Sequence, residues 1–158
     1  MELRLARAIL EREIEHYRKE HQAPLLVRAR ELFSALTLGE HSSLQTHYDE
    51  DDRPQLVALR ADGRSVGVEG MSSGTRDQLF LALRLATLEE YLARSEPMPF
   101  IVDDILVNFD DERARATLEV LAELATRTQV LLFTHHGRIR EHAKELGDRA
   151  SVLELGAS

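Results

Sequence analysis

Two adjacent carboxylates end an apolar stretch in the C-terminal half of the chain. Phe100, Ile101 and Val102 precede Asp103 and Asp104. Such a run is typical of a strand in the centre of a sheet, and open α/β sheets bind ligands at the carboxyl ends of their strands. Two carboxylates there can divide the work, one binding Mg²⁺ directly or through water and the other polarising an attacking water. Taken alone, the pair is equally compatible with an ordinary strand-to-helix turn.

An element of small residues lies upstream, where Ser72, Ser73 and Gly74 precede a long helix expected at residues 75–94. Small side chains let the backbone approach a ligand closely, and the free N–H groups and dipole of a helix start attract an anion. A plain serine N-cap is the competing interpretation.

A second apolar run, residues 129–133, is followed by Thr134, His135 and His136. A histidine at the same sheet edge as the carboxylates can donate a hydrogen bond to a phosphate oxygen. A surface histidine pair in a loop is one alternative. Zinc binding by both histidines is another, which we disfavour because neighbouring side chains diverge on an extended chain.

The pattern of apolar and turn residues along the rest of the chain predicts the helices and strands that position these candidate site residues. A helical pattern with a narrow apolar stripe covers residues 1–35 and is interrupted at Pro24. Residues 37–70 predict a small antiparallel meander with strands at 43–48, 55–60 and 65–69, its acidic run at 49–52 being a solvated loop tip rather than a metal site. Strands at 99–103, 129–133 and 151–155 then alternate with helices at 112–125 and 139–146. This alternation predicts a mainly parallel sheet with flanking helices, its first two strands buried on both faces.

Composition narrows the class of protein. The 158 residues suit one compact domain, and 43% apolar with 30% charged residues is an ordinary globular balance. The chain has no cysteine, which excludes disulfides and thiolate metal sites. It has no apolar run of about 18 residues and no secretory signal, so we expect a cytoplasmic protein without a membrane partner. A net charge of −8 gives no overall attraction to nucleic acid.

The order of these motifs resembles that of the ABC-type ATPases, and within them the SMC, RecF and RecN group, with the bacterial YhaN-like proteins the most similar. Residues 71–75 stand where the ABC signature stands, residues 100–104 match Walker B, 107–110 match the D-loop, and Thr134-His135 match the switch histidine. The resemblance implies an α/β fold, the C-terminal lobe of an ABC/SMC-type P-loop NTPase head. Residues 1–36 would be an N-terminal helical segment ending a coiled-coil arm, and residues 37–158 the C-terminal half of the head.

The resemblance also implies a role for each matching residue. Asp103 would hold Mg²⁺, Asp104 would position the water that attacks ATP, and His135 would contact the γ-phosphate. The residues of the signature and the D-loop would bind ATP on the opposing head and organise the dimer interface: Ser72, Ser73, Gly74 and Asp110. Hydrolysis would then release the two heads, and positioning and charge stabilisation supply most of such catalysis.

Three departures from the family pattern shape what we expect of this chain. Ser73 replaces the usual glycine, Asp104 replaces the usual glutamate, and no Gly-x-x-x-x-Gly-Lys-Ser/Thr segment is present. We therefore expect a fragment of a larger protein or one subunit of a split head, inactive alone. Its partners would be an N-terminal Walker A half, a second head and, through the full-length protein, DNA, in DNA repair or chromosome maintenance.

Two other functions remain open at this point. A degenerate head that dimerises without hydrolysing ATP would explain the missing P-loop, Ser73 and Asp104. A Mg²⁺-dependent phosphatase or nuclease using Asp103 and Asp104 would leave the Ser-Ser-Gly element unexplained.

Overall fold

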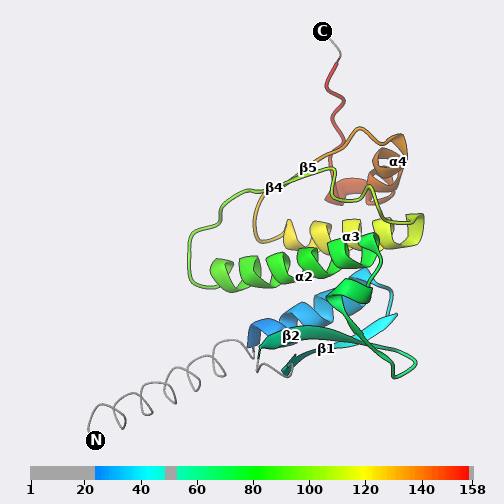
Figure 1. Cartoon of the computed structure of the whole chain (residues 1–158). Helices are drawn as coiled ribbons and strands as arrows, with labels where there is room; N and C mark the ends of the chain where they lie inside the picture. The colour runs from blue at the N-terminus through cyan, green and yellow to red at the C-terminus, as the bar shows by residue number, and fades with distance from the viewer. Residues whose placement is uncertain (1–23, 49–52, 157–158) are drawn as a thin grey trace, which may run out of the picture.

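The computed structural model describes residues 24–48 and 53–156 (Figure 1). The first described element is a helix at residues 24–36, which starts at the proline that interrupts the helical pattern predicted for residues 1–35. The stripe at residues 1–23 and the acidic run at 49–52 lie outside the described residues. The elements that follow are β1 (His41–Tyr48), β2 (Pro54–Arg60), β3 (Ser65–Gly67), α2 (Ser73–Leu92), β4 (Phe100–Asp103), α3 (Asp111–Leu124), β5 (Val130–Phe133) and α4 (Gly137–Glu145), with short 3-10 turns at Val68–Gly70 and Gly147–Arg149.

The predicted antiparallel meander is confirmed. β2 pairs with β1 on one side and with β3 on the other, both antiparallel. The β2–β3 turn uses Gly63 at φ +83°, a conformation that favours glycine, and the Asp62 carboxylate accepts a hydrogen bond from the Arg64 N–H at 3.0 Å. The third strand is shorter than expected, because the chain turns into a 3-10 helix at Val68 and leads towards α2.

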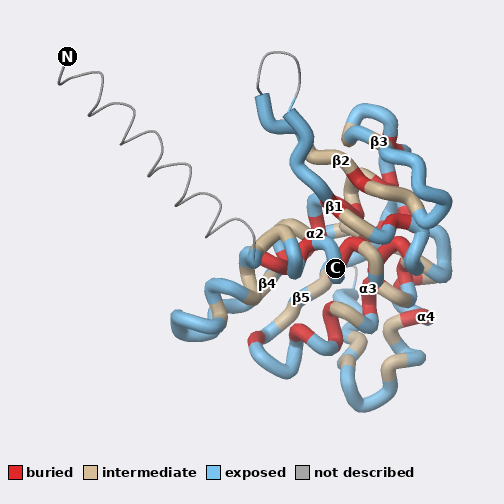
Figure 2. The backbone as a smooth tube through the Cα atoms, turned by 90° about the horizontal axis from the view of Figure 1, so that it is seen from below, coloured by how far each residue is buried: buried red, intermediate tan, exposed pale blue. Residues whose placement is uncertain are grey.

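The parallel part of the fold consists of β4 and β5, joined through α3. Their register pairs Phe100 with Val130 and Asp103 with Phe133, so the two strands end at the same edge. The expectation that both faces are buried is wrong for one face. Val102 is only 7% exposed, whereas Ile101 is 61% exposed, and β5 alternates between half-buried and exposed positions along its length (Figure 2). Nothing among the described residues covers the face that carries Ile101.

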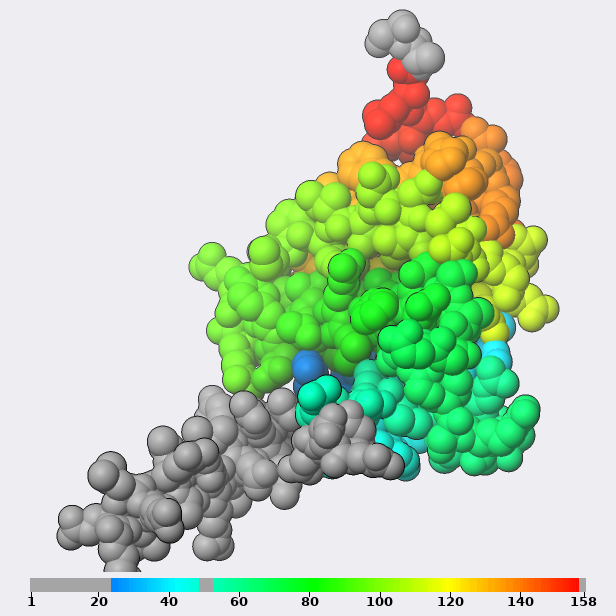
Figure 3. Space-filling view, viewed as in Figure 1, coloured from blue at the N-terminus to red at the C-terminus, as the bar shows by residue number. Residues whose placement is uncertain are grey.

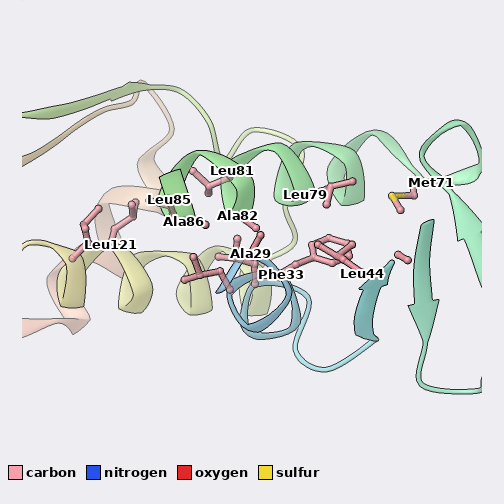
Figure 4. Close-up of a cluster of buried hydrophobic side chains, with 14 residues drawn as sticks. Ala29, Phe33, Leu44, Met71, Leu79, Leu81, Ala82, Leu85, Ala86 and Leu121 are labelled. Carbon is pink, nitrogen blue, oxygen red and sulfur yellow. The ribbon is translucent and has the colours of Figure 1, made fainter. Parts of the chain in front are cut away.

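The main core lies where α2 packs against the helix at 24–36 and the meander (Figure 4). Phe33, Leu79 and Leu85 are almost completely buried there, and Phe100 and Val130 pack against the same cluster from the inner face of the sheet. A second, smaller cluster holds the other end of the fold together through residues of the β4–α3 loop, α3 and α4: Leu106, Phe109, Ala114, Leu118 and Ile139. The two clusters fix the ends of β4 and β5 relative to α2 and α4.

The strand expected at residues 151–155 is wrong. These residues form no strand, Leu153 and Leu155 are strongly exposed, and the segment projects from the rest of the molecule (Figure 1 and Figure 3). A strand needs a neighbour to pair its backbone groups, and within the described residues the parallel sheet consists of β4 and β5 alone.

No described helix is long and apolar enough to cross a bilayer.

Candidate functional site: the carboxyl edge of β4 and β5

Asp104 lies at the centre of a polar cluster at the ends of the two parallel strands. Its backbone N–H donates to the Phe133 carbonyl at 2.8 Å, which continues the sheet by one residue. Its φ of +50° is rare for a residue with a side chain, and such conformations concentrate at functional sites. The Thr134 hydroxyl donates to Asp104 Oδ1 at 2.9 Å, and His135 Nδ1 lies 2.8 Å from Oδ2. The carboxylate expected to position water and the expected switch histidine are thus in direct contact.

His136 joins the same cluster, contrary to the expectation that neighbouring histidines diverge. The ring centroids of His135 and His136 are 4.0 Å apart, and His136 Nε2 is 3.6 Å from Asp104 Oδ2. The expectation was wrong, because the regular strand ends at Phe133 and the residues that follow it need not point to alternate faces of the sheet. There the His136 N–H turns back to the Thr134 hydroxyl at 3.2 Å, just before α4 begins.

Asp103 lies beside this cluster but takes no part in it. It is exposed, and its side chain makes no hydrogen bond or ion pair with any described residue. A carboxylate oxygen, such as the one that Asp103 offers at the end of β4, is the kind of ligand that Mg²⁺ prefers. Asp103 can therefore supply one oxygen ligand to the Mg²⁺ that the sequence resemblance implies.

The Ser-Ser-Gly element begins α2 as an N-cap. Ser72 Oγ accepts the Thr75 N–H at 3.1 Å and lies 2.8 Å from the Thr75 hydroxyl, while Ser73 is the exposed first residue of the helix. The capping interpretation and the phosphate-binding interpretation are compatible, because a capped helix start still presents backbone N–H groups. No hydrogen bond or ion pair joins either serine to Asp103, Asp104 or His135 among the described residues.

Gly74 brings the helix start against the loop that follows β4. A Cβ at this position would lie 2.6 Å from the Asn108 carbonyl oxygen, closer than side chains approach a backbone atom. The Asn108 side-chain amide also donates to Asp77 on α2 at 2.8 Å. Two contacts therefore clamp the start of α2 to the loop at residues 105–110.

Asp110, at the end of that loop, caps α3. Its carboxylate accepts the Arg113 N–H at 2.9 Å and lies 3.4 Å from the Arg113 guanidinium. The side chain is nevertheless mostly exposed, so the cap does not remove it from the surface. Asp110 does not reach the Asp104 cluster.

Arg138 on α4 was not singled out from the sequence, although it organises the whole loop. Its guanidinium donates to the Phe109 carbonyl at 2.8 Å and to the carbonyls of Leu106 and Val107 at 3.4 Å. It also pairs with Asp111 at 3.0 Å. Beside this guanidinium and the His142 imidazole, the pKa of Asp111 is held below its usual value. An arginine one residue inside a helix carries no sequence signal for such a role.

Comparison with solved structures identifies the class to which this architecture belongs. A structure from work on ATP-driven dimerisation and DNA-stimulated activation of SMC ATPases matches with a TM-score of 0.66 at 16% identity, over 81% of this chain and 77% of that one. The Smc head domain of Pyrococcus furiosus, solved with an extended coiled coil and bound to the C-terminal domain of ScpA, matches with a TM-score of 0.62 at 18% identity, over 86% and 35% of the two chains. The predicted fold is confirmed: the chain folds as an α/β lobe of an SMC-type head.

A relative found by sequence shows which SMC-like proteins this chain resembles. The uncharacterised protein YhaN of Bacillus subtilis (strain 168) is 30% identical over 154 residues, which are 97% of this chain and 15% of that protein. The chain therefore spans 15% of the length of the relative it matches. The predicted resemblance to SMC-like proteins of the YhaN kind is confirmed. No family model matches the chain.

Proposed function

We propose that this chain is the C-terminal half of an SMC-like ATPase head and completes an ATP-hydrolysis site with a half that carries Walker A. The observation that supports this function best is the contact of Asp104 with Thr134 and His135. The ends of the two parallel strands and the start of α2 would supply the parts of the hydrolysis site other than Walker A.

Each residue has a part in the proposed reaction. Asp103 would hold Mg²⁺, which neutralises the charge that develops on the phosphates when it is bound. Asp104 would orient the attacking water, with the Thr134 hydroxyl holding the carboxylate in place. His135 is largely exposed next to Asp104 and has room to reach a γ-phosphate.

The signature residues would act on the opposing head. Among the described residues, no hydrogen bond or ion pair joins Ser72, Ser73 or Gly74 to the Asp104 cluster, as expected if they serve the ATP of a second head. Asp110, exposed at the end of the 105–110 loop, would lie at the interface of that dimer.

The half that carries Walker A would cover the open face of the parallel sheet. Parallel strands in α/β proteins are covered on both faces, yet Ile101, Leu131 and Phe133 leave an apolar face exposed here.

We place residues 1–36 at the end of a coiled-coil arm and residues 37–158 in the head. We further propose a cytoplasmic protein of DNA repair or chromosome maintenance that reaches DNA through its other parts.

The test is ATP turnover by this chain alone and mixed with the N-terminal half of its parent protein. We expect turnover only in the mixture, abolished by Asp104→Asn and by Ser72→Arg. The matched control is Asp148→Asn, which removes the same charge from an exposed aspartate without described contacts.

A folded, associated mixture without turnover would favour the degenerate dimerisation module. Turnover by the chain alone would contradict the proposal and favour a metal-dependent hydrolase.

A further inference from the structure

Three metal-binding side chains converge on one point at the strand ends. One donor atom each from Asp104, His135 and His136 lies within 4.8 Å of the other two. The carboxylate follows β4 and the imidazoles follow β5, so parallel pairing of the strands brings them together.

The spacing of the donor atoms fits a tetrahedral ion. Zn²⁺ binds nitrogen and oxygen at about 2.0–2.2 Å, which separates neighbouring tetrahedral donors by about 3.3 Å. Asp104 Oδ2 lies 2.8 Å from His135 Nδ1 and 3.6 Å from His136 Nε2, on either side of that value. Shifts of a few tenths of an ångström would therefore bring each imidazole nitrogen to the spacing from Oδ2 that a shared ion requires, and the two nitrogens themselves lie within 4.8 Å of each other.

The surroundings leave these atoms available for a metal. Thr134 donates to Asp104 Oδ1 and so orients the carboxylate with Oδ2 towards the histidines, as partners of metal ligands commonly do. His136 Nε2 is shielded from solvent and has no hydrogen-bond partner among the described residues. Within the same part of the chain, no lysine or arginine pairs with the Asp104 carboxylate.

The type of donor selects the kind of ion. Mg²⁺ prefers oxygen ligands and octahedral geometry, whereas two imidazoles and one carboxylate suit a borderline ion such as Zn²⁺. We propose that Asp104, His135 and His136 form a transition-metal site that binds one Zn²⁺ ion and leaves a fourth position open to water. Such an ion would hold Asp104 and His135, the residues proposed above to act on ATP. The binding itself does not depend on that proposal.

The test is direct metal binding by the chain, free of any histidine tag and without nucleotide. Competition with a chromophoric chelator should give one Zn²⁺ per chain, and Co²⁺ in its place should give the intense visible absorption of a tetrahedral site. Thr134→Val, which removes only the orienting hydroxyl, should weaken binding by about 10- to 100-fold. His136→Gln removes a direct ligand and should weaken binding more than Thr134→Val does. The matched control is His47→Gln, because His47 is an exposed histidine on β1 whose Nε2 lies 3.4 Å from Gln45 Oε1 and which is not part of the Asp104 cluster.

The outcomes separate this proposal from the proposed function. No Zn²⁺ binding by the wild-type chain, or equal binding by a folded His136→Gln chain, would overturn the metal site and leave the ATPase proposal untouched. His135→Gln provides a second ligand variant if the circular-dichroism melt of His136→Gln shows a folding defect. Conversely, the absence of ATP turnover in the reconstituted head would not affect the metal titration.

Discussion

Leu79 on α2 and Ile101 on β4 are both aliphatic residues of regular secondary structure, yet the first is 0% and the second 61% exposed. Leu79 belongs to a core whose covering elements, the helix at 24–36 and the meander, lie in the same described chain. Ile101 lies on a sheet face that no described element covers. The region around Leu79 is therefore complete within the described residues, whereas the region around Ile101 leaves an apolar face uncovered.

The largest expected effect is on the free energy of unfolding, through the main core around Leu79. Leu79→Ala leaves a cavity in the main core and should lower the free energy of unfolding by about 2–5 kcal/mol. Phe80→Ala is the matched control, since Phe80 is the next residue on the same helix and is half exposed. That larger truncation should cost less than about 1 kcal/mol. Urea unfolding measures both, and equal losses would contradict the division into two regions.

The next effect concerns the contact between the start of α2 and the loop at residues 105–110. Alanine is normally favoured over glycine within a helix, but a Cβ at Gly74 would meet the Asn108 backbone oxygen at 2.6 Å. Gly74→Ala should therefore lower stability by about 1–3 kcal/mol, the usual cost of overpacking. Gly137→Ala, at the start of α4 with open space around it, should be neutral or stabilising. A thermal melt in which Gly74→Ala matches Gly137→Ala would show that α2 and the loop at 105–110 are not in contact.

A smaller effect on stability is expected from pH, through a histidine buried beside Phe33 of the main core. His41 is buried against Phe33, neither ring nitrogen has a described hydrogen-bond partner, and burial lowers its pKa below the usual value near 6.5. The folded state therefore holds His41 neutral, while the unfolded chain binds a proton below about pH 6.5. Stability should fall as the pH is lowered through this value, and His41→Phe should reduce that slope. Urea midpoints at several pH values measure it, and an unchanged slope would contradict a neutral buried histidine.

The sequence predicts some features of this structure better than others, because only some features leave a local pattern in the sequence. Local patterns gave the meander, α2 and the ends of β4 and β5, since apolar periodicity and turn residues determine such elements directly. Residues 151–155 show the limit, because an apolar pattern does not reveal whether a neighbouring strand exists. The contact of Gly74 with Asn108, the role of Arg138 and the convergence of His136 on Asp104 arise from how loops turn after the strands. No spacing in the sequence encodes those turns.

The smallest effect on the chain itself should come from the open sheet face. Ile101→Thr keeps a β-branched residue on the strand and should change stability by less than about 0.5 kcal/mol, because the side chain already faces solvent.

If the Walker A half covers this face, the same change loses apolar burial on association. The dissociation constant of the two halves should then rise about tenfold, which corresponds to about 1.4 kcal/mol. Isothermal titration calorimetry with the N-terminal half measures it, with Leu153→Thr in the projecting C-terminal segment as the control. Unchanged binding by Ile101→Thr would mean that the open face is not where the missing half docks.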